Sequence, residues 1–169
     1  MPHSRELAIG GLRRDHLLEA LRRRDVGLNE HARTLLAHAA FDEPEKRVIR
    51  VTERSVRDLG LSGGAPLSGV FAAAAAAGLA PCPLVTAPFL RLAMTDQAAS
   101  SDSVMSAGRA PEGSLTVASA PVSADDEYPK GFYVRVVDGR PWLRGYRCDD
   151  EHLWSPDDRF VFAVDQPGV

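Results

Sequence analysis

The chain has 169 residues, of which 44% are hydrophobic and 25% are charged. These proportions are typical of a globular protein, and the length predicts a single domain spanning residues 1–169. The 20 basic and 23 acidic side chains give a formal net charge of −3, so no general positive field attracts nucleic acid or an anionic membrane. Nucleic-acid binding is therefore not expected.

The two cysteines are too few for a disulfide framework, and the N-terminal residues lack the cationic and apolar regions of a secretory signal. The continuous apolar run over residues 70–79 is too short to cross a bilayer. We therefore expect a cytoplasmic protein with no membrane segment.

Residues 1–44 are predicted to form a helical section. Leucines recur on one helical stripe over residues 12–24 while arginines face elsewhere, as in an amphipathic helix. After a break at Gly27, Asn29 has the side chain of an N-cap, and apolar residues follow it at helical spacing. The section is therefore expected to contain two helices.

Residues 45–80 are predicted to contain a strand and a helix. Branched aliphatic residues favour a strand over residues 46–51, and Thr52 offers a cap for a following turn of helix. Alanines favour a second helix over residues 67–77, and Gly78 supplies the left-handed conformation that ends it.

Residues 88–164 are predicted to form a mainly antiparallel sheet. Apolar residues alternate over residues 89–95, which indicates a strand that directs Arg91 away from the aliphatic side chains. The Ser-, Ala- and Gly-rich residues 97–113 predict a flexible loop. With the N-terminal and central helices packed on one face of the sheet, this organisation defines an α+β fold.

A β-hairpin is the sharpest local prediction. Asp138-Gly139 lies between two alternating runs and indicates a two-residue type I′ turn, because both positions of that turn need positive φ. If Val137 pairs with Arg140, one face carries aliphatic residues and the other interleaves aromatic rings with guanidinium groups. With Arg91 added from the neighbouring strand, the candidate ligand-binding residues are Arg91, Tyr133, Arg135, Trp142, Arg144 and Tyr146.

Such a face can stack a planar ligand, or hold a phosphate or carboxylate between its guanidinium groups. Alternatively, the cross-strand pairs only stabilise an exposed surface of the sheet. In the first case an anion relieves the repulsion between arginines. Arg91→Ala is then predicted to weaken binding more than it lowers stability, because an exposed arginine adds little to folding.

Acidic triplets at residues 125–127 and 149–151 are expected at the open end of the same hairpin. Their charges either extend into water, hold a hard cation, or pair with Lys130 and Arg147. Neither triplet has the spacing of a calcium loop, so solvated loops are the preferred interpretation and no metal is expected.

The sequence lacks the motifs of common cofactor enzymes. Gly64 and Gly69 have the spacing of a phosphate-binding loop, but Val70 and Phe71 replace its lysine and its hydroxyl residue. No dinucleotide-binding, serine-hydrolase or paired-cysteine zinc motif occurs, so no cofactor is expected.

Two functions remain open. The first is a non-catalytic binding or interaction module that uses the arginine and aromatic face for a protein partner, a second copy of the chain, or a small anionic or planar ligand. The alternative is a cofactor-free isomerase, cyclase or lyase with a cleft between sheet and helices. In that enzyme an anion would be bound, or a proton transferred, by Arg91, Tyr133, Arg135 and Tyr146.

Three segments carry a family resemblance: GLAPCPLVTAPFLRLAMTDQ, SLTVASAPVSADD, and GFYVRVVDGRPWLRGY with the later Trp154 and PDDRFVFAV. They resemble a family of small uncharacterised bacterial proteins, some of which are labelled helicases. The resemblance covers about residues 27–164 and implies a shared fold unit, with no known activity. A helicase needs a phosphate-binding loop and motor domains, which a chain of this length does not contain.

Overall fold

The computed structural model describes residues 4–94, 99–100 and 113–164. Within these ranges, nine strands form one mixed sheet, and α-helices pack on both of its faces. The chain therefore has the predicted α+β fold, but with helices on both faces of the sheet rather than on the one face expected. In chain order the elements are β1 (Ser4–Ile9), α1 (Arg14–Arg23), β2 (Gly27–Leu28), α2 (Glu30–Leu36), η1 (Ala39–Phe41), β3 (Arg47–Ser55), η2 (Arg57–Leu59), α3 (Leu67–Ala76), β4 (Leu79–Ala80), α4 (Thr86–Ala93), β5 (Ala99–Ser100), β6 (Leu115–Val117), β7 (Gly131–Val137), β8 (Arg140–Tyr146) and β9 (Arg159–Val164).

The strand order is β1-β3-β9-β6-β7-β8-β2, with β4 added beside β9 and β5 beside β7. The pairs β6–β9, β2–β8 and β5–β7 are parallel, so the sheet is mixed rather than mainly antiparallel as expected. Parallel pairing needs a long connection between the two strands. The chain provides one in each case, because the hairpin separates β6 from β9 and most of the chain separates β2 from β8.

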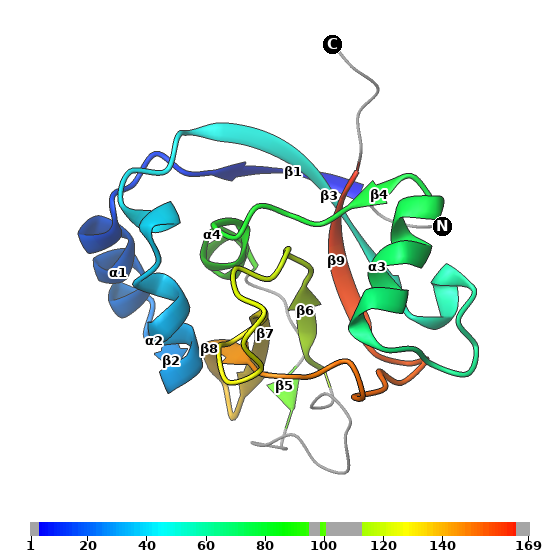
Figure 1. Cartoon of the computed structure of the whole chain (residues 1–169). Coiled ribbons are helices and arrows are strands. Elements are labelled where there is room, and N and C mark those ends of the chain that lie inside the picture. The colour runs from blue at the N-terminus through cyan, green and yellow to red at the C-terminus, as the bar shows by residue number, and fades with distance from the viewer. Residues whose placement is uncertain (1–3, 95–98, 101–112, 165–169) are drawn as a thin grey trace.

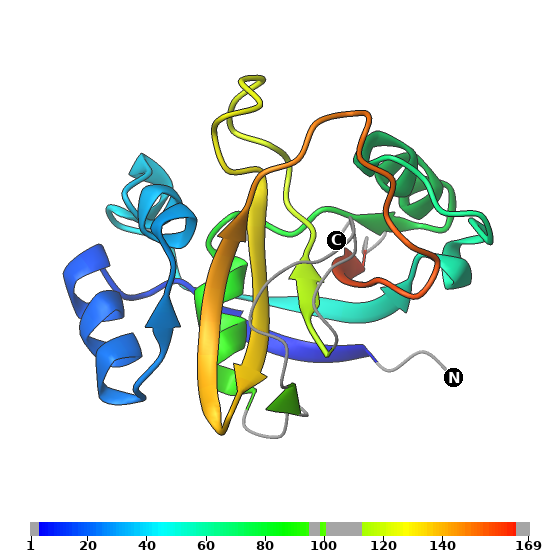
Figure 2. The same cartoon turned by 90° about the horizontal axis from the view of Figure 1, so that it is seen from below.

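The sheet curves around α4, which Figure 1 shows nearly end-on inside the arc of strands. α4 packs against β1, β7 and β8, and apolar residues of α1 and α2 join the same core. A second core lies on the other face of the sheet, where α3 packs beside β4 and β9. Figure 2 shows the hairpin β7–β8 in front of α4, with β2 along the edge of β8.

The predicted strand over residues 89–95 is wrong, because Thr86–Ala93 forms the helix α4. A short apolar run is compatible with either a strand or a buried helix. Pro88 was interpreted as the start of a strand, but it is the third residue of the helix, where its missing N–H would have no intrahelical partner in any case. Burial inside the curved sheet then favours the helix, since α4 has few polar residues to expose.

The predicted helices α1, α2 and α3 and the predicted strand β3 are all present, and β6 and β9 lie within residues 88–164, which were expected to form a sheet. Asn29 caps α2 by accepting a hydrogen bond from the backbone N–H of Ala32, and Gly78 has a φ of 79° after α3. Strand β1 was missed within the section expected to be helical, because only its last residues show alternating burial. Ala99–Ser100 pairs with β7, and residues 97–98 and 101–112 of the predicted loop lie outside the described residues.

Candidate functional site

The hairpin has the predicted register, with Val137 opposite Arg140 and Gly131 opposite Tyr146. At its turn, the φ angles of Asp138 and Gly139 are 51° and 80°, as a type I′ turn requires. Phe132, Val134 and Leu143 belong to the core around α4, so the opposite, outer face of the hairpin carries the arginines and aromatic residues, as predicted.

Near the turn, three side chains form a stack that we call the Arg–Trp cluster: Arg140, Trp142 and Arg144. The guanidinium carbons of Arg140 and Arg144 lie 4.9 Å and 4.3 Å from the centroid of the indole ring. Trp142 and Arg144 are half-buried, and Arg140 is exposed. The cluster is therefore a cation–π arrangement that is partly open to solvent.

The neighbouring strand β2 supports the Arg–Trp cluster. Gly27 pairs with Trp142, and a Cβ atom at Gly27 would lie 2.5 Å from the indole ring. The absence of a side chain therefore lets the ring lie against the backbone of β2. Arg140 donates a hydrogen bond from Nε to the backbone oxygen of Asp25 at 3.1 Å and forms an ion pair with its carboxylate at 3.4 Å.

Farther along the same face, the predicted residues are covered. Tyr133 and Tyr146 are 6% and 3% exposed. The ring of Trp154 packs against Tyr146 with a centroid distance of 5.4 Å and against Phe160 with a centroid distance of 4.9 Å. We call this group the aromatic cluster; its members are Tyr133, Tyr146, Trp154, Phe160 and Phe162.

Two of the predicted binding arginines are buried. Arg135 lies on the outer face of β7 but has no exposed surface. Arg91 belongs to α4 on the opposite side of the sheet, is 3% exposed, and donates hydrogen bonds to the backbone oxygens of Arg135 at 3.2 Å and Trp142 at 3.4 Å. The expectation of an exposed Arg91 beside the hairpin face is therefore wrong: its guanidinium joins α4 to the backbone of the hairpin.

Sequence reasoning missed three polar residues next to Tyr146. Ser119, His152 and Trp154 each carry a buried polar atom, as does Tyr146, and within the described part of the chain none of these atoms has a hydrogen-bond partner. An unsatisfied buried polar group costs about 1–3 kcal/mol. Trp154 is one of the residues that carry the family resemblance, but the sequence does not show that its indole N–H is buried, where it would normally find a partner. Ser119 gave no signal, since its position depends on the pairing of β6 with β7.

The open end of the hairpin carries the acidic triplets. Glu127 forms an ion pair with Arg147 at 2.6 Å, and the Nζ of Lys130 donates to the backbone oxygens of Ser123 and Asp125. Carboxylates of both triplets surround Cys148, whose pKa is raised to about 11, chiefly by burial. Its thiol is therefore protonated at neutral pH and is a poor nucleophile.

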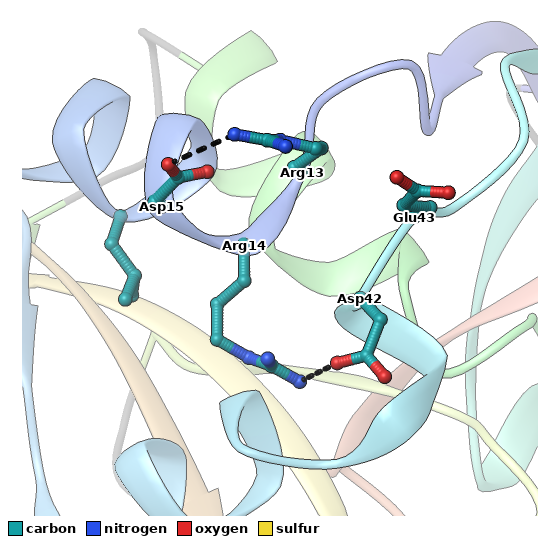
Figure 3. Close-up of a pocket in the computed structure, with 6 residues that line it drawn as sticks. Arg13, Arg14, Asp15, Asp42 and Glu43 are labelled. Atoms are coloured by element: carbon teal, nitrogen blue, oxygen red, sulfur yellow. Dashed lines mark hydrogen bonds and ion pairs between the residues drawn. The ribbon is translucent and has the colours of Figure 1, made fainter.

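A hollow of about 560 Å³ opens elsewhere, between the start of α1 and the end of η1 (Figure 3). Arg14 crosses it, donating to the backbone oxygens of Leu36 and His38 and pairing with Asp42 at 2.7 Å. Arg13 pairs with Asp15 at 3.4 Å. These charged side chains bind one another and the backbone carbonyls at the end of α2. They therefore stabilise the helical section and do not converge on a position that a ligand could occupy.

Among the described residues, no group of three or more His, Cys, Asp or Glu side chains has the arrangement of a metal site. In the same part of the chain, no helix has both the length and the apolar character needed to cross a membrane. The features that remain as a candidate site are therefore the two parts of the outer hairpin face.

The fold and this face define an α+β protein with a helix enclosed by a curved sheet and an arginine and tryptophan surface on one hairpin. No family model, curated protein or solved structure matches the chain. The function is therefore argued from the residues of the face alone.

Proposed function

We propose that the chain is a cytoplasmic binding module that recognises an anionic group attached to a planar ring through the Arg–Trp cluster. The single observation that carries this proposal is the stacking of two guanidinium groups on one half-buried indole. Guanidinium groups bind phosphates and carboxylates in two-point contacts, and their planes can also stack on an aromatic ring. The planar anion is either a free molecule or a group displayed by a protein partner, including a second copy of the chain.

Rigid support favours binding by this cluster. Arg91 holds the backbone oxygen of Trp142 from inside the sheet, and Gly27 lets the indole lie against β2 from the side. A preformed surface loses less conformational entropy on binding than a mobile one. The two free cysteines are consistent with a reducing compartment, which supports the cytoplasmic location.

The enzymatic alternative has weaker support. It requires a cleft between sheet and helices, but α4 occupies the space enclosed by the sheet. Its four candidate residues, Arg91, Tyr133, Arg135 and Tyr146, are each no more than 6% exposed. We therefore propose the binding module alone.

The test uses phenyl phosphate as the probe and the ¹⁵N-labelled full chain. The chain has two tryptophans, so the indole N–H signals of Trp142 and Trp154 can be followed separately by nuclear magnetic resonance. We expect a saturable shift of the Trp142 signal. Arg144→Lys keeps the charge but loses the planar guanidinium, and is expected to weaken binding about tenfold. Arg23→Lys, at an exposed position of α1, is the matched control.

Native mass spectrometry tests the partner form of the proposal. A dimer or a captured partner that depends on the cluster should be lost in the double variant Trp142→Ala with Arg144→Ala. An unchanged assembly in that variant, together with no shift of the Trp142 signal by phenyl phosphate, would remove the proposal.

A further inference from the structure

The open end of the outer hairpin face contains a second group of polar atoms, separate from the Arg–Trp cluster. Ser119 Oγ, the Tyr146 hydroxyl and Trp154 Nε1 belong to residues that are at most 3% exposed, and His152 Nε2 lies at their half-buried margin. Within the described residues these four atoms have no hydrogen-bond partner. Buried polar atoms of native proteins are normally satisfied, so this concentration of four points to a ligand.

Two of the atoms meet over Gly131. The ring of Tyr146 lies across this glycine, and a Cβ atom placed there would be 3.2 Å from the Tyr146 hydroxyl and 3.3 Å from Ser119 Oγ. Any side chain at residue 131 would therefore occupy the position that both hydroxyls flank. Glycine therefore avoids a close contact with both hydroxyls, which keep no hydrogen-bond partner among the described residues.

Aromatic rings border this pair of hydroxyls. Trp154 meets Tyr146 edge to face at an interplanar angle of 82°, and His152 meets Trp154 in the same manner at 90° with centroids 5.2 Å apart. His152 is the least buried member of the group, so it lies on the side of the group that is nearest to solvent.

The charges around the group favour an uncharged ligand. Burial is the largest cause of the raised pKa of Cys148, which is two residues from Tyr146. Among the nearby charges, Lys130 lowers this pKa, while Asp149, Asp150 and Asp126 raise it. Negative charge therefore predominates here and disfavours an anion. Burial raises the pKa of Tyr146, so its hydroxyl stays neutral and able both to donate and to accept.

We propose that Ser119, Gly131, Tyr146 and Trp154 form a binding site for a small, flat, uncharged molecule bearing a primary amide or a similar donor–acceptor group. The amide oxygen would accept from the Trp154 N–H, which can only donate, and the amide N–H groups would donate to the two hydroxyl oxygens. The proposal is independent of the Arg–Trp cluster, because none of its residues belongs to that cluster.

The probe is benzamide, and benzoate is its charged isostere. Each is titrated into the ¹⁵N-labelled full chain while the Trp154 indole N–H and the Gly131 backbone N–H are observed. We expect saturable shifts of both signals with benzamide and affinity for benzoate at least about tenfold weaker, the effect of losing one good hydrogen bond. If benzamide shifts neither signal up to its solubility limit, the proposal is overturned and the four polar atoms are assigned to bound water.

Two variants test whether benzamide binds at this site. Tyr146→Phe keeps the ring and removes the hydroxyl, and Gly131→Ala fills the position between the two hydroxyls. Both are expected to weaken benzamide binding at least about tenfold. Gly63→Ala is the matched control, because a Cβ atom there meets nothing within 4 Å. Thermal unfolding confirms that each variant is folded, and benzamide affinity unchanged in folded Tyr146→Phe would overturn the site.

Phenyl phosphate separates this proposal from the proposed function. It should shift the Trp142 signal and leave the Trp154 signal in place, whereas benzamide should do the reverse. Failure of benzamide therefore removes the amide site without affecting the Arg–Trp cluster, and failure of phenyl phosphate counts against the cluster alone. Benzamide shifts at Trp142 alone would overturn the amide site.

Discussion

Trp142 and Trp154 both lie over the outer face of the hairpin, yet they have different surroundings. Trp142, near the turn, is half-buried and contacts two guanidinium groups. Trp154, near the open end, is 2% exposed and contacts the rings of Tyr146, His152 and Phe160. The strands beneath are continuous, so the difference arises from what covers each end.

Two chain segments cover the open end of the outer hairpin face, and backbone hydrogen bonds hold these segments together. Ala65 and Trp154 exchange two backbone hydrogen bonds, and a Cβ atom at Gly64 would lie 2.4 Å from the Trp154 oxygen. This close approach lets the loop after β8 place its indole over Tyr146. Alternation along a strand therefore determines which face a side chain occupies, while distant loops determine whether that face is open.

The largest expected effect tests the contrast directly. Trp154→Ala removes a fully buried indole from the aromatic cluster and should lower the free energy of unfolding by about 3–5 kcal/mol. Chemical denaturation of the variant measures this loss. A loss below about 1 kcal/mol would mean that Trp154 is as loosely held as a surface residue, and the distinction between the two ends would fail.

Arg91→Ala should rank next. Its guanidinium satisfies the backbone oxygens of Arg135, Trp142 and Met94 inside the protein, and hydrogen bonds from a charged donor are each worth about 1.5–3 kcal/mol. We expect a loss of about 3 kcal/mol in unfolding free energy, the reverse of the small stability effect predicted for an exposed residue. Arg57→Ala, whose ion pair with Asp157 is exposed, is the control and should change stability by less than about 1 kcal/mol. Equal losses in the two variants would contradict a structural role for Arg91.

The hairpin turn and the helix α4 show how far the sequence can predict the fold. The Asp138-Gly139 turn fixed the register of β7 and β8 because local φ preferences and a period of two act within a few residues. The helix α4 was mistaken for a strand, since a run that short fits both periods and only its enclosure by β1, β7 and β8 decides between them. Because α4 was predicted as a strand, Arg91 was also predicted on the wrong side of the sheet.

The candidate site shows the same limit. Trp142 and Arg144 contact each other because they are two residues apart on one strand, which alternation alone predicts. Ser119 and Tyr146 come together over Gly131 only through the pairing of three strands. The turn predicts the pairing of Gly131 with Tyr146, but no local pattern encodes the pairing of β6 with β7 that brings Ser119 there. The proposed amide site was therefore not predictable from sequence.

Alkaline pH should destabilise the chain through a thiol beside the open end. The backbone of Cys82 pairs with that of Ser119 in an isolated parallel β-bridge. Burial raises the pKa of the Cys82 thiol from 9.0 to about 12. Between these values the unfolded chain releases the proton while the folded chain retains it, so the free energy of unfolding falls as pH rises, by about 1.4 kcal/mol per unit. Denaturation at pH 9 and pH 10 should show this extra decrease in the wild-type chain and not in Cys82→Ala. Identical pH dependence of the two would contradict the burial of the thiol.

The smallest stability effect is expected at Trp142, where the effect on binding should be greatest. Trp142→Ala removes a half-buried ring whose cation–π contacts at a partly exposed position are worth about 0.5–1 kcal/mol each, and the open surroundings relax without leaving a sealed cavity. The free energy of unfolding should therefore fall by about 1–2 kcal/mol, less than half the effect of Trp154→Ala. Phenyl phosphate affinity, measured by calorimetry because the reporting indole is gone, should fall at least about tenfold. Trp142→Ala could instead destabilise the chain as strongly as Trp154→Ala and leave phenyl phosphate binding intact. In that case the Arg–Trp cluster stabilises the sheet by packing and does not bind a ligand.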